Sequence, residues 1–146
     1  MLTEELGKSL HHLLVKQDRL VAAPIDIVFD TVLNPVGPMA DMGIKIEPWP
    51  GGRWFRDLGN NTGHLWGHVQ VIKPPKLLEL CGPMMMSYPV MSHVQYRLTE
   101  EPGGTRLALT HQAVGLLTPE HREGVVKGWS DILDLIRDNA QVRAKK

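Results

Sequence analysis

The chain of 146 residues is long enough for one domain, and a domain of this size buries about 70% of the surface that its unfolded chain exposes. Its 16 basic and 16 acidic residues give zero formal net charge, which excludes the charge excess of a nucleic-acid-binding protein, a polybasic membrane patch or an acidic tail. The single cysteine, Cys81, excludes an internal disulfide framework. No apolar run approaches the ~20 residues of a membrane span, and the acidic N-terminus is unlike a signal peptide. We therefore expect a soluble, cytoplasmic protein.

The first part of the chain is expected to lie outside the folded unit. We predict an N-terminal extension over residues 1–13 and a single domain over residues 14–146. Residues 10–23 are ambiguous between helix and strand, and we favour a strand over residues 14–22.

Proline and glycine then mark the bounds of short helices. Pro24 opens a helix whose apolar residues fall on one face: Ile25, Val28, Phe29 and Val32. Asn34-Pro35 and Gly37-Pro38 end it, and residues 39–43 are expected to form another helical turn.

The middle of the chain alternates short apolar runs with turn signals, which is typical of antiparallel strands. Three such signals are Pro50-Gly51-Gly52, Gly59-Asn60-Asn61 and Pro74-Pro75. The final pair of strands forms the clearest hairpin, joined by residues 100–104. The predicted strands cover residues 44–49, 53–57, 63–72, 77–81, 90–98 and 105–114.

Residues 118–143 read as one long amphipathic helix. Thr118 is a good N-cap, and Pro119 occupies the first helical position, where its missing N–H costs nothing. The apolar residues recur at spacings of three and four: Val125, Val126, Trp129, Ile132, Leu133, Ile136 and Ala140. Such a stripe needs a wide apolar surface to cover it, and the strands supply one. The element order therefore predicts an α+β fold, with an antiparallel sheet that buries one face on the C-terminal helix.

Several segments resemble the START-like (SRPBCC) superfamily, and in particular the branch related to the C-terminal domain of the activator of the Hsp90 ATPase. They occur in the family's order over roughly residues 14–140. The segments are Ala23-Pro24, Val28-Phe29, Pro50-Gly51-Gly52, Gly67-His68-Val69, Pro74-Pro75-Lys76-Leu77, Gly104-Thr105-Arg106-Leu107, Thr110-His111 and Gly128-Trp129.

The resemblance implies a helix-grip fold, in which a curved sheet of about six to seven strands wraps around the long helix and a cavity lies between them. Members of the superfamily bind lipids, polyketides, hormones or aromatic compounds there, and some act as cyclases. The family's tryptophan-rich segment after the first helix is replaced here by Gly37-Pro38-Met39-Ala40-Asp41-Met42. The Hsp90 activator also carries an N-terminal domain that this chain lacks, so co-chaperone activity does not transfer with the fold.

Histidine spacing argues against a metal site. His64 and His68 share a face of their predicted strand but lie about 13 Å apart along it, too far to chelate one ion. His11 and His12 point to opposite faces if they lie on a strand. No glycine-rich phosphate loop is present, and Cys81 has no neighbour in sequence to activate it. We expect no metal, no cofactor and no catalytic cysteine.

His111 has the same strand parity as Leu107 and Leu109 and should point inward. A buried imidazole needs a hydrogen-bond partner, and in a cavity it could anchor a polar ligand or act as a general base. A structural histidine explains the same pattern. Trp66 shares its parity with His64 and His68, so either a bulge flips it inward or it lies on the outer face, where it would suggest a homodimer contact.

The methionines Met84, Met85 and Met86 offer flexible apolar surface, and Trp49, Trp54, Trp66 and Tyr96 offer aromatic surface, although core packing explains the same residues. We predict binding of a hydrophobic or amphipathic small molecule between sheet and helix. The alternatives are a cyclase or lyase that uses His111 as acid/base, and an interaction module with an Hsp90-type chaperone as its partner. The predicted ligand contacts are Phe29, Trp54, Met84, Met86, Tyr96, His111 and Trp129.

Overall fold

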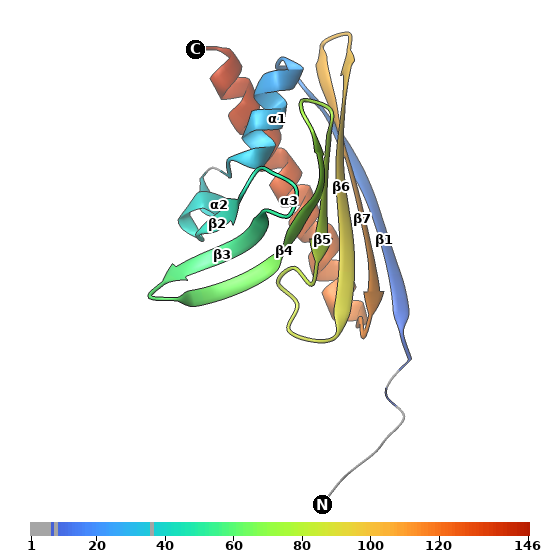
Figure 1. Cartoon of the computed structure of the whole chain (residues 1–146). Helices are drawn as coiled ribbons and strands as arrows, with labels where there is room; N and C mark the ends of the chain where they lie inside the picture. Colours follow the sequence, from blue (N-terminus) through green and yellow to red (C-terminus); the bar gives the residue numbers. More distant parts are fainter. Residues whose placement is uncertain (1–6, 8, 36) are drawn as a thin grey trace, which may run out of the picture.

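The computed structural model describes residue 7, residues 9–35 and residues 37–146 (Figure 1). A seven-stranded antiparallel sheet packs against one long helix, which confirms the predicted α+β helix-grip fold. The elements in chain order are β1 (His11–Val21), α1 (Ile25–Leu33), α2 (Pro38–Asp41), β2 (Ile44–Ile46), β3 (Arg53–Gly59), β4 (Thr62–Lys73), β5 (Leu77–Gly82), β6 (Val90–Glu101), β7 (Gly104–Gly115) and α3 (Pro119–Ala144).

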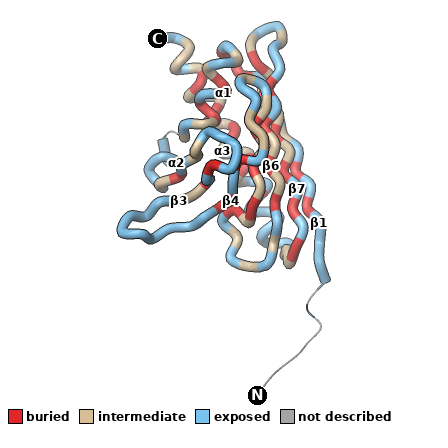
Figure 2. Tube along the Cα trace, viewed as in Figure 1, coloured by how far each residue is buried: buried red, intermediate tan, exposed pale blue. Residues whose placement is uncertain are grey.

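The sheet order is β1-β7-β6-β5-β4-β3-β2, so the first strand, β1, pairs with the last strand, β7. Along β6 and β7 the residues alternate between buried and less buried, as expected of strands with one face on a core. Figure 1 shows that the β3–β4 hairpin bends away from the long strands β6, β7 and β1. Figure 2 shows that the tip of this hairpin is exposed, while buried residues line the long strands. The sheet is therefore in two parts, one close to the helix and one turned away.

The start of helix α3 and most of its buried face agree with the prediction from the sequence. Thr118 caps it, since its Oγ1 accepts a hydrogen bond from the His121 backbone N–H at 3.3 Å. The predicted stripe was wrong at one position, because Val126 is 40% exposed. Val126 follows Val125 by about 100° around the helix axis, which turns it out of the buried stripe. The buried stripe is Val125, Trp129, Leu133, Ile136 and Ala140.

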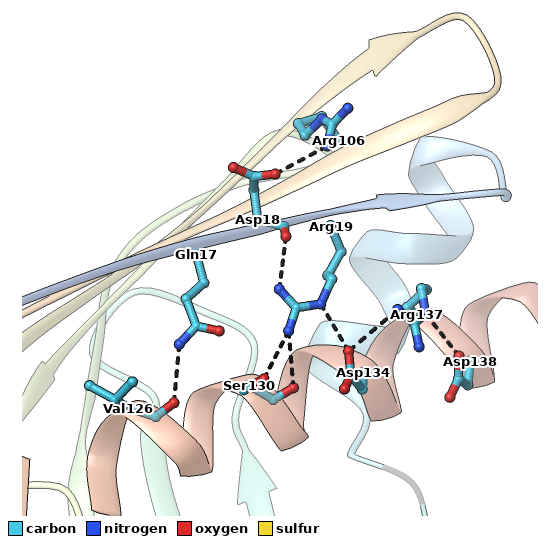
Figure 3. Close-up of polar contacts among 9 residues, drawn as sticks. All are labelled: Gln17, Asp18, Arg19, Arg106, Val126, Ser130, Asp134, Arg137 and Asp138. Carbon is cyan, nitrogen blue, oxygen red and sulfur yellow. Dashed lines mark hydrogen bonds and ion pairs between the residues drawn. The ribbon is translucent and has the colours of Figure 1, made fainter. Parts of the chain in front are cut away.

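Polar contacts fix β1 to the outer side of α3 (Figure 3). The Arg19 guanidinium donates from Nε to Asp134 Oδ1 at 2.9 Å and from Nη2 to Ser130 Oγ at 3.1 Å. Gln17 Nε2 donates to the carbonyl oxygen of Val126 at 3.0 Å. These contacts hold α3 against β1, the edge strand of the sheet.

Several predicted bounds shift. The first strand starts at His11 rather than residue 14, within the predicted extension, of which residues 1–6 and 8 lie outside the described residues. Strand β2 ends at Ile46 because residues 47–52 form a turn, closed by a bond from Gly52 N–H to Trp49 O at 2.8 Å. The last hairpin is tighter than predicted, since Glu101 pairs with Gly104. Only Pro102 and Gly103 form its loop, and Gly103 adopts a φ of 93° that favours glycine.

Candidate functional site

A cavity of about 280 Å³ lies where the sheet turns away from α3. Its walls come from α1, α2, β2, β3, β4, β5, the loop after β5, β6 and α3, and they are predominantly apolar. The exposed lining residues lie in the loop after β5 and in the first turns of α3, so the cavity opens between these two segments: Met85, Glu120, His121 and Gly124. Tyr88 stacks on His121 beside this opening, with ring centroids 4.8 Å apart.

Two pairs of aromatic rings line the cavity. Trp54 and Trp66 meet edge to face, with centroids 5.3 Å apart and planes at 82°. Tyr96 and Trp129 make a similar contact at 6.1 Å and 78°, which joins β6 to α3. Edge-to-face contacts of this kind hold rings in fixed orientations. The predicted pocket aromatics thus lie on the cavity wall except for Trp49, which is 54% exposed in the turn before β3.

A β-bulge turns Trp66 inward. Trp54 pairs with Gly67 and Phe55 with Leu65, so Trp66 is the extra residue on β4. Trp66 is buried at 6% exposure while Leu65 is 52% exposed. This settles the question that strand parity left open, because the outer-face alternative is wrong. His64 and His68 are both exposed, and because the bulge lies between them they pair with Arg56 and Arg53, which lie on opposite faces of β3.

Methionines supply much of the flexible wall. Met84, Met85 and Met86, in the loop after β5, all line the cavity, and Met39 of α2 joins them. Met84 is 4% exposed and has a φ of 60°, and its N–H donates to Trp66 O at 2.8 Å. The segment that departs from the family's usual pattern, residues 37–42, therefore still borders the cavity through Met39.

His111 lies behind this wall rather than in it. Trp129 Nε1–H donates to His111 Nδ1 at 2.9 Å, and His111 Nε2 lies 3.0 Å from Ser92 Oγ. An indole N–H can only donate, so Nδ1 must accept, and the proton of the neutral ring is on Nε2. Burial lowers the pKa of His111 to about 4. Both ring nitrogens are engaged within the core, and neither is free to act on a substrate.

The structure brings together five of the seven predicted ligand contacts on the cavity wall: Trp54, Met84, Met86, Tyr96 and Trp129. Phe29 and His111 are buried but do not line the cavity. Sequence reasoning missed Gly124 and Gly128, which lie four apart on the cavity side of α3. Their signal was present, because two glycines inside a long helix lower its intrinsic stability.

Two buried polar groups lack hydrogen-bond partners among the described residues, Trp66 Nε1 on the cavity wall and the Tyr88 hydroxyl beside the opening. The Tyr96 hydroxyl makes no hydrogen bond to a described residue either, and burial raises the pKa of Tyr96 above its usual value. Across the part of the chain that the structure describes, no three histidine, cysteine or acidic side chains cluster as a metal site would require.

No helix in the described ranges is both long enough and apolar enough to cross a bilayer.

Solved structures share this fold. SA2116 from Staphylococcus aureus is similar with a TM-score of 0.70 at 13% identity, covering 94% of this chain and 98% of that one. CalU16 from Micromonospora echinospora gives a TM-score of 0.57 at 26% identity, covering 86% of this chain and 71% of its own. The di-domain ARO/CYC protein StfQ from the steffimycin biosynthetic pathway gives 0.66 at 11% identity, covering 92% of this chain and 52% of StfQ.

No curated protein matches the sequence. Residues 22–141 match the family described as activator of Hsp90 ATPase homolog 1-like protein. The match spans most of the chain and agrees with the helix-grip fold. The protein therefore belongs to the activator of Hsp90 ATPase homolog 1-like family, a branch of the START-like superfamily.

Proposed function

We propose that the protein binds a hydrophobic or amphipathic small molecule in the cavity between the sheet and α3. The observation that carries this proposal is an apolar cavity of about 280 Å³ beside the buried core. That volume is just below the roughly 300–1,000 Å³ typical of small-molecule sites. It is also well above the space that packing defects leave in protein interiors.

The glycines of α3 support the same conclusion. A Cβ atom added at Gly124 or Gly128 would meet no heavy atom within 4 Å. Each glycine costs a helix interior about 1 kcal/mol relative to alanine, and packing does not require either one. Their effect is to leave the helix side of the cavity empty, which a binding site needs and a solid core does not.

Most of the binding free energy would come from apolar burial against Trp54, Trp129 and the methionines Met84 and Met86. The hydroxyl of Tyr96 is the polar anchor, because it lies on the wall and has no hydrogen-bond partner among the described residues. StfQ belongs to a biosynthetic pathway, that of steffimycin, which agrees with an organic molecule as the ligand class of this fold.

The engagement of both ring nitrogens of His111 argues against the cyclase alternative in the form that uses His111. A general base needs a free nitrogen within reach of the substrate. A binding function makes no such demand.

Titration with N-phenyl-1-naphthylamine, an uncharged dye that fluoresces in apolar surroundings, tests the proposal. We expect saturable binding with one dye per chain. Gly128→Leu should weaken binding roughly tenfold or more, because the new side chain fills the cavity. It should also raise the free energy of unfolding, because leucine is the better helix former.

The matched control is Lys127→Leu, which adds the same side chain one residue away on the exposed side of α3. It should leave dye binding unchanged. Binding that Gly128→Leu does not alter would overturn the proposal and favour the protein-interaction alternative.

A further inference from the structure

Two sulfur atoms meet on the outer face of the sheet, the face turned away from the core. Cys81 Sγ of β5 lies 3.7 Å from Met91 Sδ of β6. Burial alternates along both strands, so that Leu80 and Gly82 are buried on either side of Cys81, and Ser92 is buried beside Met91. The side chains of Cys81 and Met91 therefore point away from the core, and Met91 is 55% exposed.

The pairing of the strands adds an imidazole to these two sulfurs. His93 lies directly opposite Cys81 in the register of β5 and β6, and it follows Met91 by two residues on the same face of β6. Side chains directly opposite on neighbouring strands have Cβ atoms about 4.5–5.5 Å apart. All three side chains line one shallow hollow of the surface. The fold thus gives Cys81 the neighbours that it lacks in the sequence.

A carboxylate orients the imidazole. His93 Nε2 lies 3.2 Å from Glu79 Oε1, and Gln95 Nε2 donates to Glu79 Oε2 at 2.9 Å, which holds the carboxylate in place. An ionised carboxylate only accepts hydrogen bonds, so His93 Nε2 carries a proton. Nδ1 of the neutral ring then keeps a free lone pair, and it has no hydrogen-bond partner among the described residues. Histidines that bind metals commonly donate their other ring N–H to a carboxylate in this way.

The types of ligand atom indicate the metal. Thiolate and thioether sulfurs are soft ligands that favour Cu(I), whereas zinc sites in proteins use cysteine, histidine and acidic side chains. Three ligands spaced evenly around an ion, with sulfurs at the usual ~2.3 Å from it, place two sulfurs ~4.0 Å apart. The distance between Cys81 Sγ and Met91 Sδ is 3.7 Å, so the two sulfurs need to move little to bind one ion.

The set differs from the histidine, cysteine and acidic clusters considered above, because a methionine is one of its three members. Its charge also suits a monovalent ion. When Cu(I) binds, the Cys81 thiol releases its proton to water and the metal takes the proton's place on sulfur. Metal and thiolate together are then uncharged, and no electron is transferred.

We infer that Cys81, Met91 and His93 form a binding site for Cu(I), in which Glu79 positions the imidazole. The cavity is lined by Leu80, the neighbour of Cys81 on β5, whose side chain points to the other face of the sheet. The copper site is therefore separate from the cavity and does not depend on the proposed binding function.

Anaerobic titration of the full chain with Cu(I), in competition with the chelator bicinchoninate, tests the inference. We expect one ion per chain, bound tightly enough to compete with the chelator, and Cys81→Ser should abolish this binding. Met91→Leu and His93→Gln should each weaken it about tenfold or more, because loss of a residue that only supports a metal ligand already costs about that much. Leucine has nearly the volume of methionine, so Met91→Leu should leave the fold intact.

Met42→Leu is the matched control, because it makes the same substitution at another exposed methionine, one that is 43% exposed. It should leave Cu(I) binding unchanged. In ¹H–¹³C spectra of protein labelled at the methionine methyl groups, Cu(I) should shift the Met91 signal and leave the Met42 signal in place. Zn(II), which does not favour thioethers, should not shift the Met91 signal.

Three results would overturn the inference. They are an affinity that any of the three ligand substitutions leaves unchanged, a shift of the Met42 signal in place of the Met91 signal, and a stoichiometry of one ion per two chains. The last result would mean that Cu(I) bridges the thiolates of two copies. Dye binding to the cavity is measured separately, so failure of the copper site is distinct from failure of the proposed function.

Discussion

The two tryptophans on opposite walls of the cavity have different environments. Trp129 of α3 is 2% exposed and donates to His111, which in turn contacts Ser92. Trp66 of β4 is nearly as buried, yet its indole N–H has no acceptor among the described residues. Trp129 packs across to Tyr96 of β6, whereas Trp66 is the bulged residue of β4 in the β3–β4 hairpin, which bends away from the long strands (Figure 1).

The difference distinguishes a region of the protein that contributes to stability from a region that leaves room for binding. Where sheet and helix are close, every polar group in the Trp129–His111–Ser92 chain has a partner, as folded interiors require. Where they separate, the protein retains an unpartnered donor and empty space, both of which cost stability. Departures from good packing concentrate at functional sites in natural proteins. The four predictions below test this contrast.

The largest contrast is between the two tryptophans themselves. Trp129→Phe should lower the free energy of unfolding by about 2–4 kcal/mol, because it removes ring contacts and leaves the buried His111 Nδ1 without a donor. Trp66→Phe should cost about 1 kcal/mol, because the lost ring area is partly offset by removal of the unpartnered N–H. Urea unfolding of both variants measures the difference. Equal losses would mean that the two sites are energetically alike.

The pH dependence of the free energy of unfolding should reveal the burial of His111 between the sheet and α3. The pKa of His111 is lowered from 6.5 to about 4 in the fold. Above pH 6.5 the ring is neutral in both states, and its contribution to stability is fully present. As the pH falls toward 4, the unfolded chain takes up a proton that the folded chain does not, and stability is lost. Between pH 7 and pH 5 this amounts to about 2 kcal/mol.

Replacing the imidazole isolates this contribution. His111→Gln keeps a donor and an acceptor but does not titrate, so its loss of stability between pH 7 and pH 5 should be smaller than that of the unmodified protein by about the same 2 kcal/mol. Unfolding in urea at the two pH values gives the comparison. Identical pH profiles would show that His111 titrates normally in the fold.

The polar contacts between β1 and α3 should contribute moderately. Arg19→Ala removes hydrogen bonds to Asp134 and Ser130 from a side chain that is only 21% exposed, and should cost about 1–2 kcal/mol. Lys127→Ala removes an ion pair with Asp131 whose side chains are 80% and 61% exposed, and should cost less than about 0.5 kcal/mol. Thermal unfolding at low and high salt measures both. A larger loss for Lys127→Ala would contradict the account.

The smallest effect has the opposite sign. Gly128→Ala should stabilise the protein by about 0.5–1 kcal/mol, because alanine is the better helix former and its Cβ enters open space. Denaturant titration tests this. Destabilisation would show that packing requires the glycine. The glycine would then no longer be evidence that α3 leaves the cavity empty for a ligand.

The sequence was sufficient for the helix and the strands because their signals are local. Thr118 and Pro119 define the start of α3, and the three- and four-residue spacing defines its buried face except at Val126. The direction of Trp66 could not be predicted, because a bulge depends on pairing with β3 rather than on the residues of β4 alone.

The site was predictable in part for the same reason. Tyr96 and Trp54 could be placed as candidates from residue type and strand position. The position of His111 behind the wall depends on the hydrogen bond that Trp129 reaches across from α3, which no spacing in the sequence encodes. The role of Gly124 and Gly128 becomes visible only when the space beside them is known.

The most direct test of the central claim is to compare native and denaturing mass spectra of the freshly purified protein and of its Gly128→Leu variant. The account predicts a reproducible extra mass on the native protein, lost on denaturation and absent from the variant. A bare native mass, together with no saturable binding of any uncharged apolar compound, would contradict the claim that this cavity holds a ligand.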